Sequence, residues 1–186
     1  LHFLGRAMSE PKHPFVGILG GAKISGKIDI ISSLLQRVDR LLIGGAMANT
    51  FFQAMGLSTG ASLVEDDRVP VARDLLQKSG DKLLLPVDCI VAKELREGAP
   101  HRVVASTAVR HDDMVLDIGP ETATTFRNVI DGAQTILWNG PMGVFEIPPF
   151  GVGTIGLAHS VADVCDRGAL VVVGGGDSAR AADLSG

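Results

Sequence analysis

Cysteine is scarce in this sequence, and the two cysteines are far apart. Cys89 and Cys165 are the only ones among 186 residues, and neither has a cysteine or histidine partner at the short spacing of a metal site. This scarcity argues against the disulfide framework of a small secreted domain and against a structural zinc site. We expect both thiols to be reduced, small core residues of a cytoplasmic protein.

Other missing features argue against several classes of function. Tyrosine is missing, and the longest apolar runs, at 83–87 and 169–173, are far shorter than the roughly 20 residues of a membrane span. Lysine and arginine are scattered and the formal net charge is −4, so the basic stripe of a nucleic-acid-binding protein is lacking. The five histidines have no partners at diagnostic spacing, and the G-x-S-x-G elbow of serine hydrolases is absent. We therefore expect neither membrane insertion nor nucleic-acid binding.

Glycine and aliphatic residues are abundant, and their order indicates the fold. Hydrophobic residues make up 46% of the chain and there are 23 glycines, which suits an α/β domain with many tight turns. Short apolar runs without alternating polarity, typical of strands buried on both faces, alternate with amphipathic segments. We predict a three-layer, doubly wound, Rossmann-like α/β fold with a sheet of about six mainly parallel strands. The expected strands are 15–19, 40–44, 82–92, 114–119, 135–140 and 169–176.

Helices are expected between these strands. Ser25 is predicted to cap a helix whose apolar residues begin at Ile28, and further helices are expected within 65–80, 119–132 and 153–168. The segment 93–113 is the exception, because it is predicted to be an extended hairpin on the sheet edge. Nearly every expected strand ends in glycine, and in such folds ligands bind beyond the carboxyl ends of the strands.

Two lysines follow the first expected strand. Residues 21–27, GAKISGK, have the G-x-x-x-x-G-K spacing of a Walker P-loop, but Ile28 stands where that motif needs a Ser or Thr for Mg²⁺. Lys23 and Lys27 lie near a helix N-terminus, where cations are unfavourable unless an anion is bound between them. On the residues alone, an anion site and a pair of solvated surface lysines both stay open.

A second glycine-rich stretch follows the last expected strand. In VVVGGGDSARA (171–181), Gly174, Gly176 and Ala179 satisfy the dinucleotide fingerprint G-x-G-x-x-G/A. Asp177 would repel a polyphosphate unless a divalent metal neutralises both, and Mg²⁺ commonly takes one or two carboxylates together with substrate oxygens. Two alternatives stay open: Asp177 or Ser178 simply caps the final helix, or the stretch belongs to a NAD-binding Rossmann domain of an oxidoreductase.

A third stretch, LWNGPMGVFE (137–146), turns at Asn139 after an expected strand. Met142, Val144 and Phe145 offer apolar surface to an adenine, and Glu146 is able to accept hydrogen bonds from ribose hydroxyls. The alternative is that Phe145 is a core residue and Glu146 a solvated charge.

Together, these segments resemble phosphoglycerate kinase, specifically its nucleotide-binding carboxyl-terminal half. The matching segments, in order, are GGAKISGKI, LLIGGAMANTF, LPVDCIVA, LDIGPET, ILWNGPMGVFE and VVGGGDS. The resemblance covers the chain from Pro14 onward, and LHFLGRAMSEP resembles the end of the helix that joins the two halves. It implies the end of an interdomain helix at 1–14 and a nucleotide-binding domain at 15–186 that lacks its last segment.

The resemblance implies reversible phosphoryl transfer between 1,3-bisphosphoglycerate with MgADP and 3-phosphoglycerate with MgATP, a step of glycolysis. It assigns Lys23 to the migrating phosphoryl group, Lys27 to the nucleotide phosphates, Asp177 to Mg²⁺ and Ser178 to further phosphate contacts. The other residues that it implies for the nucleotide cleft are Gly21, Ala22, Gly44, Gly45, Val115, Asn139, Pro141, Val144, Glu146, Gly175 and Gly176.

The chain departs from the usual pattern of the family at Gly26, Ala46 and Val115. Val115 stands where glycine is common close to the adenine, so it is expected to narrow that pocket. The amino-terminal half, which would bind phosphoglycerate, and a late glycine-rich segment are missing. We therefore expect a piece of a longer, monomeric protein that binds ATP or ADP but does not turn over alone. A nonenzymatic remnant with an incomplete cleft is the alternative.

Overall fold

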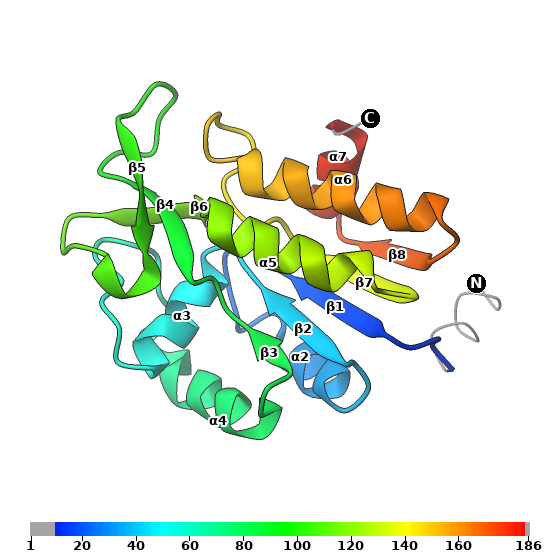
Figure 1. The fold of residues 1–186 in the computed structure, drawn as a ribbon. Helices are drawn as coiled ribbons and strands as arrows, with labels where there is room; N and C mark the ends of the chain where they lie inside the picture. Colours follow the sequence, from blue (N-terminus) through cyan, green and yellow to red (C-terminus); the bar gives the residue numbers. More distant parts are fainter. Residues whose placement is uncertain (1–9, 185–186) are drawn as a thin grey trace.

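The computed structural model describes residues 10–184 (Figure 1). Most of the expected interdomain helix at 1–14 lies outside these residues, and residues 10–14 lead into the first strand without helical structure. The strands are β1 (Phe15–Leu19), β2 (Arg40–Ile43), β3 (Leu83–Leu84), β4 (Asp88–Ala92), β5 (His101–Ala105), β6 (Met114–Ile118), β7 (Thr135–Asn139) and β8 (Leu170–Gly174). The α-helices are α2 (Ile28–Leu35), α3 (Met47–Ala54), α4 (Val69–Ser79), α5 (Pro120–Asp131), α6 (Val152–Asp166) and α7 (Gly176–Leu184). Short 3₁₀ turns are η1 (Asp66–Arg68) and η2 (Ser106–Ala108).

A five-stranded parallel sheet forms the centre of the molecule, in the order β3-β2-β1-β7-β8. From β1 the chain builds outward to β2 and β3, and it later returns to the other side of β1 with β7 and β8. The order of the strands therefore reverses between β1 and β7. In open α/β sheets this switch point is where ligands bind, outside the carboxyl ends of the strands.

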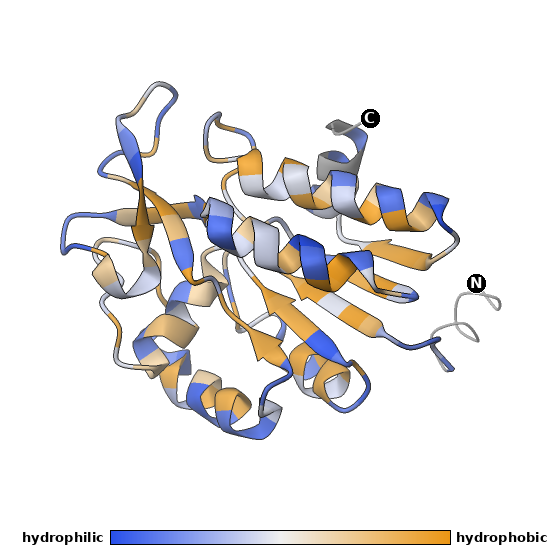
Figure 2. Cartoon of the chain, in the orientation of Figure 1, coloured by the Kyte–Doolittle hydropathy of each residue, from blue (hydrophilic) through white to orange (hydrophobic). Residues whose placement is uncertain are grey.

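Helices cover both faces of this sheet, which explains why the strands read as continuous apolar runs. Phe15 and Leu19 of β1 pack in one core with α2, α3 and α4. Val16 and Ile18 of the same strand pack in a second core with α5 and α6. Figure 1 shows α5 and α6 lying together across one face, and Figure 2 shows the strands as hydrophobic bands beneath helices of mixed polarity. The predicted three-layer α/β architecture is confirmed.

A small antiparallel sheet, in the order β5-β4-β6, was only partly predicted. The expected strand 82–92 is two strands, because β3 pairs with β2 whereas β4 pairs antiparallel with β5 and β6. Pro86 lies between them, and proline cannot donate to a ladder of hydrogen bonds. The expected strand 114–119, observed as β6, therefore belongs to the small sheet and not to the parallel one. The segment predicted as an edge hairpin, 93–113, supplies only one strand of it: β5 lies at the edge of the small sheet, and its partner β4 precedes the segment, so the prediction is correct only in part.

Helix α3 was not predicted from the sequence. Apart from Gln53, all of its residues are buried, including the polar Asn49 and Thr50, and its eight residues are fewer than the window over which a helical period is recognised. It contributes Phe51 and Phe52 to the core under β1 and β2. Within residues 10–184, no helix is long and apolar enough to cross a lipid bilayer.

Candidate functional site

Two adjoining pockets open at the carboxyl ends of the parallel strands. The first has a volume of about 240 Å³ between the loops that follow β1, β7 and β8, and we call it the glycine–lysine pocket. The second has a volume of about 210 Å³ and is also bounded by α3 and β6; we call it the apolar pocket. Gly21, Ala22, Pro141 and Asp177 line both. The two pockets are therefore parts of one cleft at the switch point of the sheet.

The loop after β1 forms the floor of this cleft. The Gly20 amide donates to the Asn139 carbonyl (3.0 Å) and the Gly21 amide donates to the Pro141 carbonyl (2.9 Å), so the ends of β1 and β7 are joined directly. The predicted cap of α2 is wrong. The helix begins at Ile28, its N-cap residue is Lys27, and no side chain caps it. The Ser25 amide instead donates to the Glu65 carboxylate (3.0 Å).

Lys27 is not a free surface lysine, because its ammonium group lies half-buried at the junction of β1 and β7. It donates to the Gly20 carbonyl, to the Asn139 carbonyl (2.9 Å) and to the Asn139 side-chain oxygen (3.0 Å). Desolvation lowers the pKa of Lys27, and the negative charge of Asp177 opposes this effect. Gly140 lies directly beside the ammonium and has φ of +103°, a backbone angle that favours glycine.

The first turn of α7 forms the opposite wall of the glycine–lysine pocket. Asp177 and Ser178 are the second and third residues of this helix, so neither is its N-cap. Asp177 is exposed at the pocket, whereas Ser178 is fully buried and its hydroxyl oxygen accepts from the Gly140 amide. First-turn amides of a helix have no intrahelical acceptor, which makes them donors for an anion. For Ser178, the amide is therefore a better candidate for phosphate contact than the hydroxyl.

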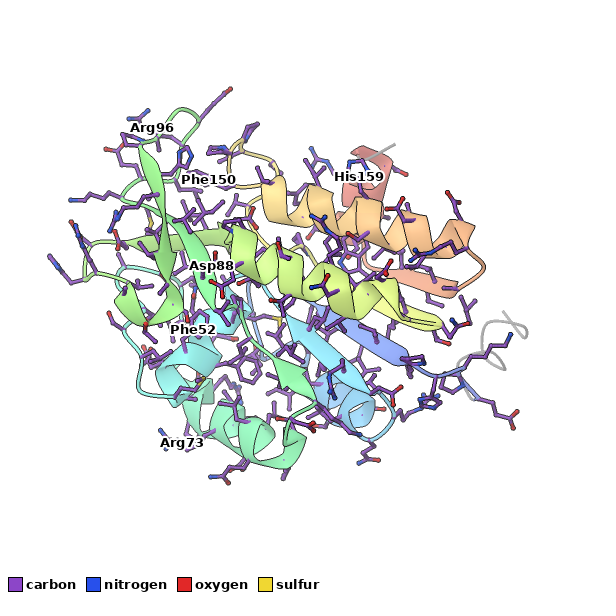
Figure 3. All side chains as sticks on the ribbon, in the orientation of Figure 1. Phe52, Arg73, Asp88, Arg96, Phe150 and His159 are labelled. Atoms are coloured by element: carbon purple, nitrogen blue, oxygen red, sulfur yellow. The ribbon has the colours of Figure 1, made fainter. Side chains whose placement is uncertain are left out.

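The apolar pocket owes its shape to an irregularity in β6. Ile90 and Val91 of β4 pair with Asp117 and Val115, so the register shifts and Leu116 is left over. A regular strand turns alternate residues away, but the bulge allows four consecutive residues, 115–118, to line one pocket. Phe52 of α3, labelled in Figure 3, and Met142 close the pocket.

Glu146 lies exposed at the edge of the apolar pocket, where it is free to meet a polar group. Phe145, in contrast, is a core residue that packs with α5 and α6. The alternative in which Phe145 belongs to the core is therefore correct. Val144 lines the pocket, and its amide donates to the Leu116 carbonyl (2.9 Å), which fixes this loop on β6.

Asp117 is a buried carboxylate in the cleft wall that sequence reasoning missed. Its oxygens accept from the Ile118 amide (2.9 Å) and from the Gly153 amide (2.8 Å) in the first turn of α6. Burial raises the pKa of Asp117 to about 7, although both amide hydrogen bonds act in the opposite direction. Its place near the end of an apolar run is the signal that could have identified it, because ligands in such folds bind beyond the carboxyl ends of the strands.

The structure gathers nearly all of the predicted site residues. Lys23, Lys27, Asn139, Gly175, Gly176, Asp177 and Ser178 line the glycine–lysine pocket. Gly45, Val115, Val144 and Glu146 line the apolar pocket, and Gly21, Ala22 and Pro141 line both. Gly44 lines neither, and a Cβ atom on it would overlap the Met142 sulfur, so its role is close packing. Met142, expected to offer apolar surface, lines the apolar pocket, and other lining residues that were not predicted include Ala46, Ala48, Phe52, Pro86, Cys89, Leu116, Ile118, Gly140 and Gly143.

The two cysteines differ in their surroundings. Both are free thiols. Cys89 is buried in the wall of the apolar pocket, and burial together with the charges of Asp88 and Asp117 raises its pKa to about 12, so it is unreactive. Cys165 is exposed near the end of α6. The prediction that both are core residues is therefore wrong for Cys165, which falls on the outer face of that helix.

The donor set of the cleft fits a Mg²⁺ ion that arrives with a phosphate ligand. In the described part of the chain, no three His, Cys, Asp or Glu side chains come together as a complete protein metal site. Asp177 nevertheless offers an exposed carboxylate beside the glycine–lysine pocket. Mg²⁺ typically uses one or two carboxylates and takes its remaining ligands from substrate oxygens and water.

Solved structures similar to this one include a phosphoglycerate kinase from Coxiella burnetii, with a TM-score of 0.92 and 42% identity. The match covers 98% of this chain and 47% of that one. A phosphoglycerate kinase from Pyrococcus horikoshii has a TM-score of 0.83 and 29% identity, over 100% of this chain and 47% of that one. The fold therefore has counterparts in solved phosphoglycerate kinases.

Sequence comparison leads to the same group of proteins. Phosphoglycerate kinases of Enterococcus faecalis and Moorella thermoacetica are 50% and 51% identical to this chain, and each match covers 98% of it. The chain spans about half the length of these relatives, 45% and 47% respectively. A sequence model of the family described as "Phosphoglycerate kinase" matches residues 1–186. With fold and sequence in agreement, the chain belongs to the phosphoglycerate kinase family.

Proposed function

We propose that residues 15–186 are the nucleotide-binding part of a phosphoglycerate kinase. The observation that carries this proposal is that Lys27 and Asp177, 150 positions apart in the sequence, line one pocket beside the first turn of α7. A positive side chain, a carboxylate and helix amides are the groups needed to hold MgADP or MgATP by its phosphates. Membership of the family sets aside the NAD-binding oxidoreductase considered for the GGGDSA stretch.

The nucleotide is held along the cleft. The apolar pocket receives the adenine, with Val115 and Val144 on its faces, and exposed Glu146 accepts hydrogen bonds from the ribose hydroxyls. The phosphates lie in the glycine–lysine pocket, over the amides of Gly175 to Ser178, with Lys27 beneath them. The small residues Gly21, Ala22 and Gly45 allow the ligand to approach the backbone closely.

The reaction is phosphoryl transfer between the acyl phosphate of 1,3-bisphosphoglycerate and MgADP, and it needs no covalent nucleophile. Lys23 holds the migrating phosphoryl group, and the α7 amides neutralise charge on the phosphate oxygens. Bound through Asp177, Mg²⁺ neutralises negative charge on the nucleotide. The chain's part of catalysis is to hold the terminal phosphate of ADP, the acceptor, in line with the acyl phosphate that donates the phosphoryl group, and to exclude water.

The rest of the active protein lies outside this chain in the proposal. 3-Phosphoglycerate binds to an amino-terminal half, and the complete protein is a cytoplasmic, monomeric enzyme of glycolysis. This accords with the match to only about half of the curated relatives.

Calorimetric titration with MgADP tests the assignment. Lys27→Ala and Asp177→Ala are each expected to weaken binding at least about tenfold, equivalent to about 1.4 kcal/mol. Because Lys27 also joins β1 and β7, Lys27→Met, which keeps the bulk of the side chain, accompanies it, and urea unfolding checks that each variant is folded. Lys78→Ala, on the exposed end of α4, is the control and should bind like the wild type. Unchanged affinity in both cleft variants, or heat with NAD but not with ADP, would contradict the proposal.

A further inference from the structure

The loop that carries Lys23 is connected to α3 directly at one end and through Glu65 at the other. On one side, the amide of Met47, the first residue of α3, donates to the Gly21 carbonyl (3.0 Å). On the other side, the Ser25 amide donates to the carboxylate of Glu65 (3.0 Å). Lys23 therefore lies in a short span with two fixed ends. The Ile24 side chain lies between these two contacts and is fully buried in the core with α3, so it anchors the middle of the loop.

Glu65 is itself fixed on α3. Its amide donates to the hydroxyl of Thr50, a buried residue in the middle of that helix (3.2 Å). Asn49 donates to the carbonyl two residues before Glu65 (3.2 Å), and Gln53 donates to the carboxylate of the residue after it (2.8 Å). Three side chains of one helix thus hold the segment 63–66 in place. The helix that binds one end of the loop directly therefore also positions the carboxylate that binds the other end.

The charge of Glu65 suits this task. Partial burial raises the pKa of Glu65, but the Ser25 hydroxyl, the amides of Ser25 and Ile24 and the positive charge of Lys23 outweigh burial, so its pKa lies below the ordinary value. The group is ionised at neutral pH, and a charged acceptor makes a stronger hydrogen bond with an amide than a neutral one. Glu65 lines neither the glycine–lysine pocket nor the apolar pocket.

We infer that Glu65 is a positioning residue that holds Lys23 at the phosphate end of the cleft by gripping the backbone at Ile24 and Ser25. The inference deepens the proposed function and rests on the role given there to Lys23. Glu65 acts on the reaction through Lys23 alone. Removing its carboxylate should loosen the loop and weaken contacts with the terminal phosphate, while leaving the contacts made by Lys27 and Asp177 unchanged.

Amide hydrogen exchange tests the attachment without any nucleotide. In Glu65→Ala, exchange at Ile24 and Ser25 is expected to become at least about tenfold faster, while β1 and α2 keep their protection. Glu65→Gln keeps the size of the side chain and one acceptor oxygen, so it should fall between Glu65→Ala and the wild type. Asp67→Asn removes the same charge two residues along, from an exposed carboxylate that pairs only with Arg68 among the described residues, and should change nothing. Unchanged exchange in Glu65→Ala would overturn the inference.

Nucleotide affinity tests the consequence for Lys23. Lys23→Ala and Glu65→Ala are each expected to weaken MgATP binding about fivefold to tenfold and to leave MgADP binding within about twofold, because ADP lacks the terminal phosphate. In the Lys23→Ala background, Glu65→Ala should have no further effect on MgATP, since coupled residues are not additive.

The two possible failures are distinguishable. If Glu65→Ala weakens MgADP and MgATP equally, or adds its full effect to that of Lys23→Ala, Glu65 is only a structural residue and the inference is wrong. If Lys23→Ala leaves the ratio of the two affinities unchanged, the role proposed for Lys23 is wrong, and the hydrogen exchange result still decides whether Glu65 fixes the loop.

Discussion

At the scale of single residues, the cleft wall contains a carboxylate shielded from water. Asp117 accepts hydrogen bonds from Ile118 and Gly153, yet burial raises its pKa to about 7, against an ordinary value of 3.8. The folded protein therefore binds this proton more tightly than the unfolded chain does. The contribution of Asp117 to stability is present below about pH 4 and is lost as the pH rises towards about 7.

Urea unfolding of wild type and Asp117→Asn between pH 4.5 and 7.5 measures this effect. The stability of the wild type relative to the variant should fall as the pH rises, by at most about 1.4 kcal/mol for each unit of pKa difference. The positive end of α6 favours the charged form, which makes the fall smaller. Asp74→Asn, on the exposed side of α4, should leave the pH dependence of the wild type unchanged. Parallel curves for wild type and Asp117→Asn would show that Asp117 does not titrate in this range.

Sequence patterns predicted the charged residues that line the glycine–lysine pocket but not the acids that are buried or bonded behind the cleft wall. Lys27 and Asp177 stand out because charge beside glycine is unusual after an apolar run. Asp117 and Glu65 do not stand out in this way, because neither lies directly beside a glycine and an acid in a sequence is ordinarily a solvated charge or a cap. Their environment depends on contacts with Gly153 and Ser25, which are 36 and 40 residues away in the chain.

At the scale of helices and strands, Asp88 shows how the small sheet is tied to α5. Its carboxylate accepts from the amides of Glu121 (3.0 Å) and Thr122 (2.8 Å) and from the Thr122 hydroxyl (2.6 Å). Figure 3 labels Asp88 near the beginning of α5. This cap comes from 33 residues earlier in the chain, so the sequence around Pro120 could not predict it. The start of the helix was predicted correctly from Pro120 and Glu121.

Asp88→Ala is expected to lower the free energy of unfolding by about 2 kcal/mol, because it leaves buried helix amides without an acceptor. Asp131→Ala, at the exposed end of the same helix, loses only a surface ion pair with Arg167 and should cost less than about 0.5 kcal/mol. Urea denaturation at neutral pH gives both values. Equal losses of unfolding free energy in the two variants would mean that the Asp88 hydrogen bonds stabilise the protein no more than a surface ion pair does.

Whether a segment forms a helix or a strand was easier to predict than which other elements it contacts. The boundaries of α4, α5 and α6 follow from amphipathic period, proline and glycine, which are local signals. Helix α3 is buried almost all round and β4 pairs across the chain with β5 and β6, so both depend on tertiary contacts. The same holds for Ser25, whose amide binds Glu65 although its residue type is typical of a helix cap.

At the scale of the whole molecule, the proposed function divides the reaction between this chain and a part outside it. We expect the purified chain to bind MgADP but to give no turnover in a coupled assay with 3-phosphoglycerate and MgATP. The reason is that the cleft described here accounts for the nucleotide, and the proposed acceptor site belongs to the amino-terminal half. Turnover by the chain alone would contradict this division. Activity that appears when a separately expressed amino-terminal half is added would support it.

The cleft is built on two separate sheets, and this has a consequence for how such a site can change. The parallel sheet supplies the loops around the glycine–lysine pocket, to which the proposed function assigns the phosphates, whereas β6 of the antiparallel sheet supplies the wall of the apolar pocket at 115–118. Substitutions that alter the preference for one base over another should therefore map to the antiparallel sheet. Substitutions that alter phosphate affinity should map to the parallel sheet. The effects of the two kinds of substitution on the free energy of binding should be additive. In the proposed function, the preferred base can therefore change during evolution or engineering without changes to the glycine–lysine pocket.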